Sequence, residues 1–172
     1  RIFNSAVAQN VDVKELAAPA DSVMFCLSKG LVSPIGSMLV GTEKFVNRAR
    51  HLRKMLGGGM RQVGIVAAAG ILSLEKMTGR LAEDHERAKR IAEGLRQIKG
   101  IIVDEDSPHT NMIFLNLSEN ASVTMQQIAE SMKELGVLID AEDSRRLRLV
   151  THYWIDDEGV EKSISAFEKA LT

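Results

Sequence analysis

The sequence predicts an α/β protein built in two parts. The segment SVMFCLS at residues 22–28 contains five consecutive apolar residues, which is typical of a strand buried on both faces of a largely parallel sheet. Residues 62–77 are almost uniformly apolar and predict a buried helix, and from residue 101 onward short strands alternate with helices. We therefore expect a larger first domain over residues 1–100 and a small α/β domain over residues 101–172, with the boundary near Gly100.

The composition is that of an ordinary globular protein. Of the 172 residues, 45% are hydrophobic and 26% are charged, so the chain can bury one sizeable core or two small ones. Its 22 basic and 23 acidic side chains nearly cancel, which argues against a nucleic-acid or membrane partner. Cys26 is the single cysteine and no apolar stretch is long enough to cross a bilayer. We therefore expect a cytoplasmic protein without intrachain disulfides.

Helices and buried strands are both predicted in the first part. They are a helix at 1–9, strands at 22–28 and 37–40, a basic amphipathic helix at 43–55 and the apolar helix at 62–77. The three glycines at 57–59 must end the basic helix, because glycine readily leaves the helical conformation. The apolar helix has no face suited to water and is expected in a core or a subunit interface. Because Arg1 is not an initiator methionine, we expect sequence to precede it in the native protein.

The first part ends with a charged surface helix at 80–99, which Gly100 stops. Beyond Gly100 the pattern changes to short strands that alternate with helices. We then expect strands at 101–103, 111–117, 137–139 and 147–150, and helices at 124–135 and 156–171. This order predicts a small sheet covered on one face by two helices.

Lys29 is the first candidate for chemistry. It follows the apolar strand directly, and the carboxyl end of a buried strand is where open α/β sheets bind ligands. Partial desolvation there lowers the pKa of an amine toward the range in which it acts as a nucleophile, as imine chemistry requires. Most lysines are solvated surface charges, so this position alone does not establish a function.

Three segments in order resemble one enzyme family. CLSKGL at 26–31 with PIGS at 34–37 resembles the cofactor-lysine segment of the low-specificity threonine aldolases, which have the aspartate-aminotransferase fold, fold type I. RKMLGGGMRQ at 53–62 and RLVTH at 148–152 resemble two further segments of that family, and RIFNSA at 1–6 resembles its stretch after the aspartate that pairs with the cofactor's pyridine nitrogen. The resemblance implies the end of the large pyridoxal-phosphate-binding domain followed by a small C-terminal α/β domain.

The resemblance also implies roles for five residues. Lys29 matches the lysine that holds pyridoxal 5'-phosphate and is then available for proton transfer. Arg1 and Arg148 match two arginines that hold the substrate carboxylate, for which a guanidinium is better suited than an ammonium group. Arg61 and Lys54 match basic residues near the cofactor phosphate, and Arg61 is the better match. Arg61 is expected to reach the phosphate from a neighbouring subunit.

The implied activity is reversible cleavage of threonine or allo-threonine into glycine and acetaldehyde. The resemblance places the ring-stacking histidine and the pyridine-binding aspartate before Arg1, so we expect the isolated chain to need that missing N-terminal portion. It also implies a homo-oligomer, a dimer or a tetramer. Two alternatives stay open: another fold-type-I reaction such as transamination or β-elimination, and a non-catalytic assembly module in which the apolar helix forms an interface.

Several of these residues also have ordinary structural interpretations. Arg148 could cap a strand or pair with Glu142 or Asp143, and the glycines at 57–59 could simply break a helix. Cys26 lies in an apolar strand and is expected to serve in packing. The four histidines lack metal-ligand spacing, so we predict no catalytic metal; they are His51, His85, His109 and His152.

Overall fold

The computed structural model describes residues 1–141 and 143–171, which form two compact units, Arg1–Leu81 and Ala82–Thr172. Sequence analysis placed a domain boundary near Gly100, and the units divide before it. The difference is one helix, α5 (Leu81–Arg96), which was assigned to the first part. Buried α5 residues such as Ala88 and Leu95 belong to the core of the second unit, so packing joins this helix to the segment that follows it.

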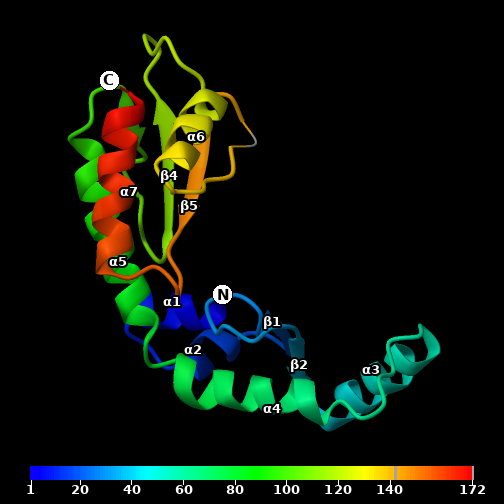
Figure 1. Ribbon diagram of the computed structural model, residues 1–172. Coiled ribbons are helices and arrows are strands. Elements are labelled where there is room, and N and C mark those ends of the chain that lie inside the picture. The colour runs from blue at the N-terminus through cyan, green and yellow to red at the C-terminus, as the bar shows by residue number, and fades with distance from the viewer. Residues whose placement is uncertain (142, 172) are drawn as a thin grey trace. The chain divides into compact units, whose positions relative to one another are not determined.

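Helices dominate the first unit, with one hairpin between them (Figure 1). Its elements are α1 (Ile2–Gln9), α2 (Val13–Ala17), β1 (Ser22–Cys26), β2 (Ser37–Gly41), α3 (Glu43–Met55), α4 (Gly64–Leu72) and the single π-helical turn η1 (Ser73–Met77). Most of these agree with the sequence analysis, which did not predict α2. Asp12 begins α2 with a capping box, because its side chain accepts from the Lys14 amide while Glu15 accepts from the Asp12 amide.

Strands β1 and β2 differ from the sequence analysis, which predicted strands buried in a largely parallel sheet. They pair antiparallel with each other, from Ser22 opposite Gly41 to Cys26 opposite Ser37. β2 is exposed along its whole length and β1 is only half-buried. A two-stranded sheet has no covering layers to bury both of its faces, so the apolar character of β1 is not matched by full burial here.

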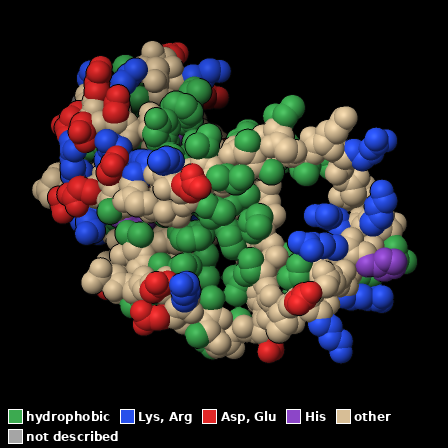
Figure 2. Space-filling view, turned by 90° about the horizontal axis from the view of Figure 1, so that it is seen from below, with side chains coloured by type: hydrophobic (Ala, Val, Ile, Leu, Met, Phe, Trp, Pro, Cys, Tyr) green, Lys and Arg blue, Asp and Glu red, His purple; other side chains and the backbone are tan. Residues whose placement is uncertain are grey.

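The helix predicted at 62–77 begins at Gly64, and its last part is η1. We expected it in a core or a subunit interface. Within this chain it is not a core helix, because Ile65 is 88% exposed and Leu72 is 58% exposed. Figure 2 shows hydrophobic side chains on the surface of this unit, with Lys and Arg side chains gathered toward α3.

A small apolar cluster holds the first unit together. Leu27, Leu31 and Leu81 are buried in it, and half-buried side chains from α1 and η1 pack against them. Phe3 of α1 meets Phe25 of β1 edge to face, with ring centroids 5.4 Å apart. The cluster therefore joins α1 and the end of β1 at the segment that contains Lys29.

The second unit is a three-stranded antiparallel sheet with helices against it (Figure 1). Its elements are α5, β3 (Ile101–Val103), β4 (Met112–Leu117), α6 (Met125–Glu134), β5 (Arg146–Val150) and α7 (Asp157–Ala170). The strands lie in the order β3-β4-β5. Alternate residues of β4 point to one face of the sheet, and the side chains on that face form a core together with all three helices. Residues 137–139 form no strand, contrary to prediction, and three helices rather than two contribute to the core.

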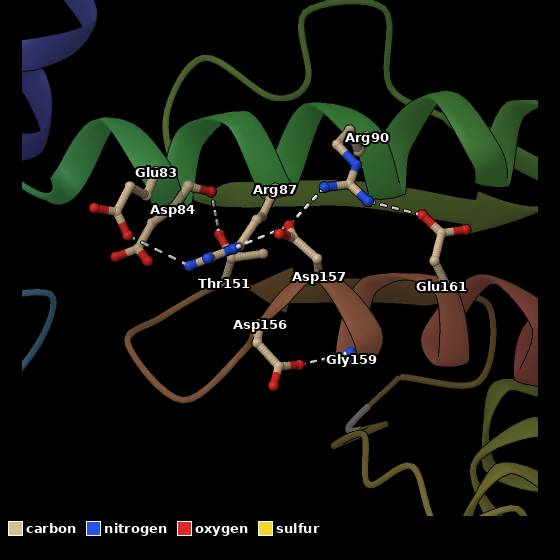
Figure 3. Close-up of polar contacts among 9 residues, drawn as sticks. All are labelled: Glu83, Asp84, Arg87, Arg90, Thr151, Asp156, Asp157, Gly159 and Glu161. Atoms are coloured by element: carbon tan, nitrogen blue, oxygen red, sulfur yellow. Dashed lines mark hydrogen bonds and ion pairs between the residues drawn. The ribbon is translucent and has the colours of Figure 1, made fainter.

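Polar contacts fasten α7 to α5 (Figure 3). Arg90 of α5 donates to Asp157 at 2.6 Å and to Glu161 at 2.8 Å, both on α7. Arg87 lies 3.6 Å from the same Asp157 carboxylate. Asp156 caps α7 by accepting from the Gly159 amide at 2.8 Å. These contacts hold the first turn of α7 against α5, and they thereby fix the C-terminal end of the loop that joins β5 to α7.

Candidate active site

Lys29 lies in a loop whose backbone is closed on itself. The Leu27 amide donates to the Gly36 carbonyl at 2.9 Å, and the Ser33 amide donates back to the Leu27 carbonyl at 3.1 Å. The Lys29 carbonyl accepts from the Val32 amide at 2.8 Å, which makes Lys29 the first residue of a tight turn. Val32 takes the strained left-handed conformation with φ of 63°. The loop is therefore a defined structure, and it holds the Lys29 backbone in place.

Close packing beneath the loop fixes it further. Gly30 and Leu31 are buried while Lys29 is exposed. A Cβ atom at Gly30 would lie 3.1 Å from Asn4 Nδ2 and 3.1 Å from Leu81 Cδ2, so any larger residue would require these side chains to shift by a few tenths of an ångström. The Lys29 amine is thus presented to solvent from a backbone that is anchored on both sides.

Arg1 is the predicted site residue that the structure brings near Lys29. Arg1 immediately precedes α1, and Asn4 of that helix lies against Gly30, since a Cβ at Gly30 would be 3.1 Å from Asn4 Nδ2. The start of α1 therefore packs against the residue that follows Lys29.

Arg148 lies in β5 on the sheet face opposite the core. It pairs with Phe114 of β4, and the next outward residue, Arg146, holds its guanidinium 5.7 Å above the Phe114 ring. Arg146 also lies 3.4 Å from Asp104, whereas no ion pair joins Arg148 to a carboxylate among the described residues. Glu142, one of the partners considered for Arg148, lies outside those residues. Arg148 shares a surface hollow with Asp140 and Asp143, and its guanidinium is exposed.

Lys54 and Arg61 are both exposed basic residues at the end of α3 and beyond it. The amide of Gly57, which has a φ of 82°, donates to the Lys54 carbonyl, so the glycines end α3 as predicted. The aliphatic part of Lys54 packs on Gly59, where a Cβ would lie 2.8 Å from Lys54 Cδ.

The remaining candidates have structural roles or no defined role. His152 Nδ1 accepts from the Trp154 amide at 3.3 Å in the turn after β5. Cys26 is half-buried, with the Ser37 hydroxyl 3.9 Å from its sulfur. Over residues 1–141 and 143–171, no three His, Cys, Asp or Glu residues are grouped so that they could hold a metal ion. No helix within those residues is long and apolar enough to cross a membrane.

Sequence reasoning did not single out the buried polar residues that support the site. Asn4 lies against Gly30 under the Lys29 loop, and Asn111 and Thr151 are buried at the end of the β4–β5 pair. One signal was available for Thr151. It follows Leu147 and Leu149 at the spacing of inward-facing strand residues, and a polar residue at such a position needs a partner.

Comparison with known proteins defines the family. The sequence profile described as beta-eliminating lyase matches residues 1–118. This chain belongs to the beta-eliminating lyase family. Among members of known annotation, low-specificity L-threonine aldolase 1 of Arabidopsis thaliana is 41% identical over 171 residues, which cover 99% of this chain and 48% of that protein. The low specificity L-threonine aldolase of Escherichia coli K12 is 45% identical over 92% of this chain and 45% of its own length. The chain thus spans about half the length of the curated relatives it matches.

Solved structures confirm the fold. A candidate L-allo-threonine aldolase from Listeria monocytogenes superposes with a TM-score of 0.82 over 99% of this chain and 50% of that one, at 22% identity. At that identity the likeness concerns the fold alone. The beta-eliminating lyase chain therefore has the α/β architecture of fold-type-I pyridoxal-phosphate enzymes, as the sequence analysis predicted.

Proposed function

We propose that the protein containing this chain is a pyridoxal-phosphate-dependent aldehyde-lyase that cleaves threonine or allo-threonine to glycine and acetaldehyde. The observation that supports this most directly is the Lys29 loop, whose tight turn presents one exposed amine and whose Gly30 packs against α1, the helix that follows Arg1. The same chain is more than 40% identical to proteins named as L-threonine aldolases. Together they support both the cofactor and the reaction class.

The residues present fit the cofactor. The exposed Lys29 amine can bond to an aldehyde, and the basic side chains of Arg61 and Lys54 suit a phosphate. When bound, pyridoxal 5'-phosphate supplies an electron sink for cleavage of a bond at the substrate Cα. We assign the phosphate primarily to Arg61 and secondarily to Lys54.

Arg1 and Arg148 bind the substrate carboxylate in this proposal. A guanidinium contacts both carboxylate oxygens, which fixes the rotation of the amino acid and hence the direction of its Cα–Cβ bond. Arg148 suits this role because its exposed guanidinium is not committed to a carboxylate among the described residues, unlike that of Arg146. The Lys29 amine, once released from the cofactor, can hold or return a proton at the substrate Cα.

We infer that the site is completed outside this chain. The match to about half the length of its relatives supports an N-terminal portion that supplies the remaining cofactor contacts, so the isolated chain is expected to be inactive. The exposed apolar surface of α4 supports assembly of the whole protein into a dimer or tetramer. A cytoplasmic location is consistent with the lone cysteine.

Borohydride reduction of the intact, cofactor-loaded protein followed by peptide mapping tests the central assignment. We expect a pyridoxyl label on Lys29 and none in the Lys29→Ala variant. Lys44→Ala, which changes another exposed lysine, is the matched control and should retain the label. A label on a different lysine, or none at all, would contradict the proposal.

A second candidate reaction is β-elimination, which the description of the matching family favours. The two reactions give different products from allo-threonine: cleavage gives glycine and acetaldehyde, whereas β-elimination gives ammonia and a four-carbon keto acid. Product analysis with the intact protein separates them. We expect equal amounts of glycine and acetaldehyde, and a keto acid would favour the second candidate.

A further inference from the structure

Thr151 has an unusual position one residue after β5. Along this strand Leu147 and Leu149 face the core, while Arg148 faces outward. Thr151 continues the inward series and is 2% exposed. A hydroxyl at a core position must be hydrogen-bonded to be tolerated, because an unpaired polar group there is costly.

The polar groups of Thr151 are bound from two other elements. Its hydroxyl donates to the Asp84 carbonyl at 2.6 Å, in the first turn of α5 (Figure 3). Its amide donates to the Asn111 carbonyl at 3.0 Å, and its own carbonyl accepts from Asn111 Nδ2 at 2.7 Å. Asp84 and Asn111 are themselves fully buried. The end of β5 is therefore tied both to β4 and to a helix across the core.

These bonds add to the β4–β5 pairing and to the burial of Leu147 in specifying which way Arg148 faces. Shifting a strand by one residue moves every side chain to the opposite face of the sheet. In β5 such a shift would turn Arg148 into the core and would remove the Thr151 hydroxyl from the Asp84 carbonyl. Because the helix carbonyl lies on one side only, the hydroxyl bond is compatible with a single register of the strand.

Arg148 depends on this anchoring more than its neighbour does. Arg146 is held by the Asp104 carboxylate and by the Phe114 ring. Arg148 has no carboxylate partner among the described residues, so its backbone is the main restraint on where its guanidinium can reach. Two-point binding of a carboxylate needs a guanidinium held in a narrow range of positions.

We propose that Thr151 is a positioning residue for Arg148: its hydroxyl bond to α5 holds β5 so that Arg148 meets the substrate carboxylate. This inference rests on the proposed function, in which Arg148 binds that carboxylate. Thr151 itself is buried and acts only through the strand.

Steady-state kinetics of the intact, cofactor-loaded protein test the proposal. Thr151→Val keeps the shape of the side chain and removes the hydroxyl, so we expect KM for allo-threonine to rise about tenfold while kcat changes less than about twofold. Thr151→Ser keeps the hydroxyl and should remain close to wild type. Thr78→Val is the matched control, because the Thr78 hydroxyl also donates to a backbone carbonyl, that of Leu74 at 3.2 Å, but in the first unit.

A double-mutant cycle with Arg148→Ala separates positioning from general destabilisation. If Thr151 acts through Arg148, adding Thr151→Val to Arg148→Ala should leave KM unchanged. The proposal would be overturned if KM rose a further tenfold when Thr151→Val is added to Arg148→Ala. It would also be overturned if Thr151→Val alone left KM unchanged. Thr151→Ala, which places no methyl group against the Asp84 carbonyl, serves if Thr151→Val does not fold. Absence of glycine and acetaldehyde with the wild-type protein would instead contradict the proposed function itself.

Discussion

Gly30 shows how a single residue determines the environment of Lys29. Its missing Cβ lets Asn4 and Leu81 pack directly against the loop backbone, so the residue beside Lys29 is fixed from below while Lys29 stays exposed. The same atoms that bury Gly30 belong to α1 and to the start of α5. The position of the amine thus depends on contacts from two segments far apart in the sequence.

We predict that Gly30→Ala destabilises the protein by about 1 kcal/mol, because Asn4 and Leu81 must shift by a few tenths of an ångström to admit the new methyl group. Urea unfolding of the intact protein measures this change in the free energy of unfolding. Gly79→Ala is the control, since a Cβ at Gly79 meets nothing within 4 Å. Equal unfolding free energies for the two variants would show that the loop is loosely packed.

At the scale of elements, α5 and α7 are joined by exposed charges. A hydrogen bond from Arg90 holds the pKa of the Asp157 carboxyl below its ordinary value, and the Arg87 charge adds to this effect. A carboxyl with a lowered pKa in the folded state stabilises that state above its unfolded pKa, which is about 3.9. That stability is lost as the pH falls through the lower, folded pKa.

We therefore predict that acid weakens the contact between α5 and α7 below about pH 4. Asp157→Asn should remove this part of the pH dependence, and added salt should reduce it in the wild type, because both partners are solvent-exposed. Unfolding free energies measured between pH 3 and pH 6 provide the test. Glu158→Gln, which changes a carboxylate of the same helical turn without an ion pair among the described residues, should leave the slope as it is.

At the scale of the whole molecule, the first unit has more apolar surface than its own residues cover. Ile65 is 88% exposed on α4, and Leu72, two turns later on the same face, is 58% exposed. Exposed apolar surface of this kind on one helix is typical of a surface that is covered in the complete protein. This chain spans about half the length of its relatives, so residues outside it cover α4, and we propose that a second subunit supplies part of them.

Ile65→Glu should therefore weaken assembly of the intact protein by about tenfold or more, because a carboxylate would be buried in the subunit contact. Sedimentation velocity over a range of protein concentrations measures the association constant. Ile102→Glu changes an isoleucine that is 53% exposed in β3 and serves as the control. Unchanged assembly of Ile65→Glu would place the subunit contact elsewhere.

Local patterns predicted most elements correctly, and the exceptions have a common cause. The predicted helix at 43–55 agrees with α3: the Thr42 side chain caps its start by accepting from the Phe45 amide, and the glycines that follow it end it, so both ends are decided within a few residues. The apolar runs at β1 and α4 were taken to mean burial, but burial depends on what else is present to cover a surface. Residues 137–139 were predicted as a strand from their apolar composition, which does not supply a pairing partner.

The sequence by itself predicted the family, the fold class and the residue types for the proposed chemistry, because short motifs such as CLSKGL and RLVTH resemble segments of one family in the same order. Only the tertiary structure decided that the loop of Lys29 packs on α1 through a close contact between Gly30 and Asn4. It also decided that Thr151 reaches the Asp84 carbonyl across the core. Such contacts join residues remote in the chain, and a periodic pattern of apolar residues specifies which face is buried but not which distant atom it meets.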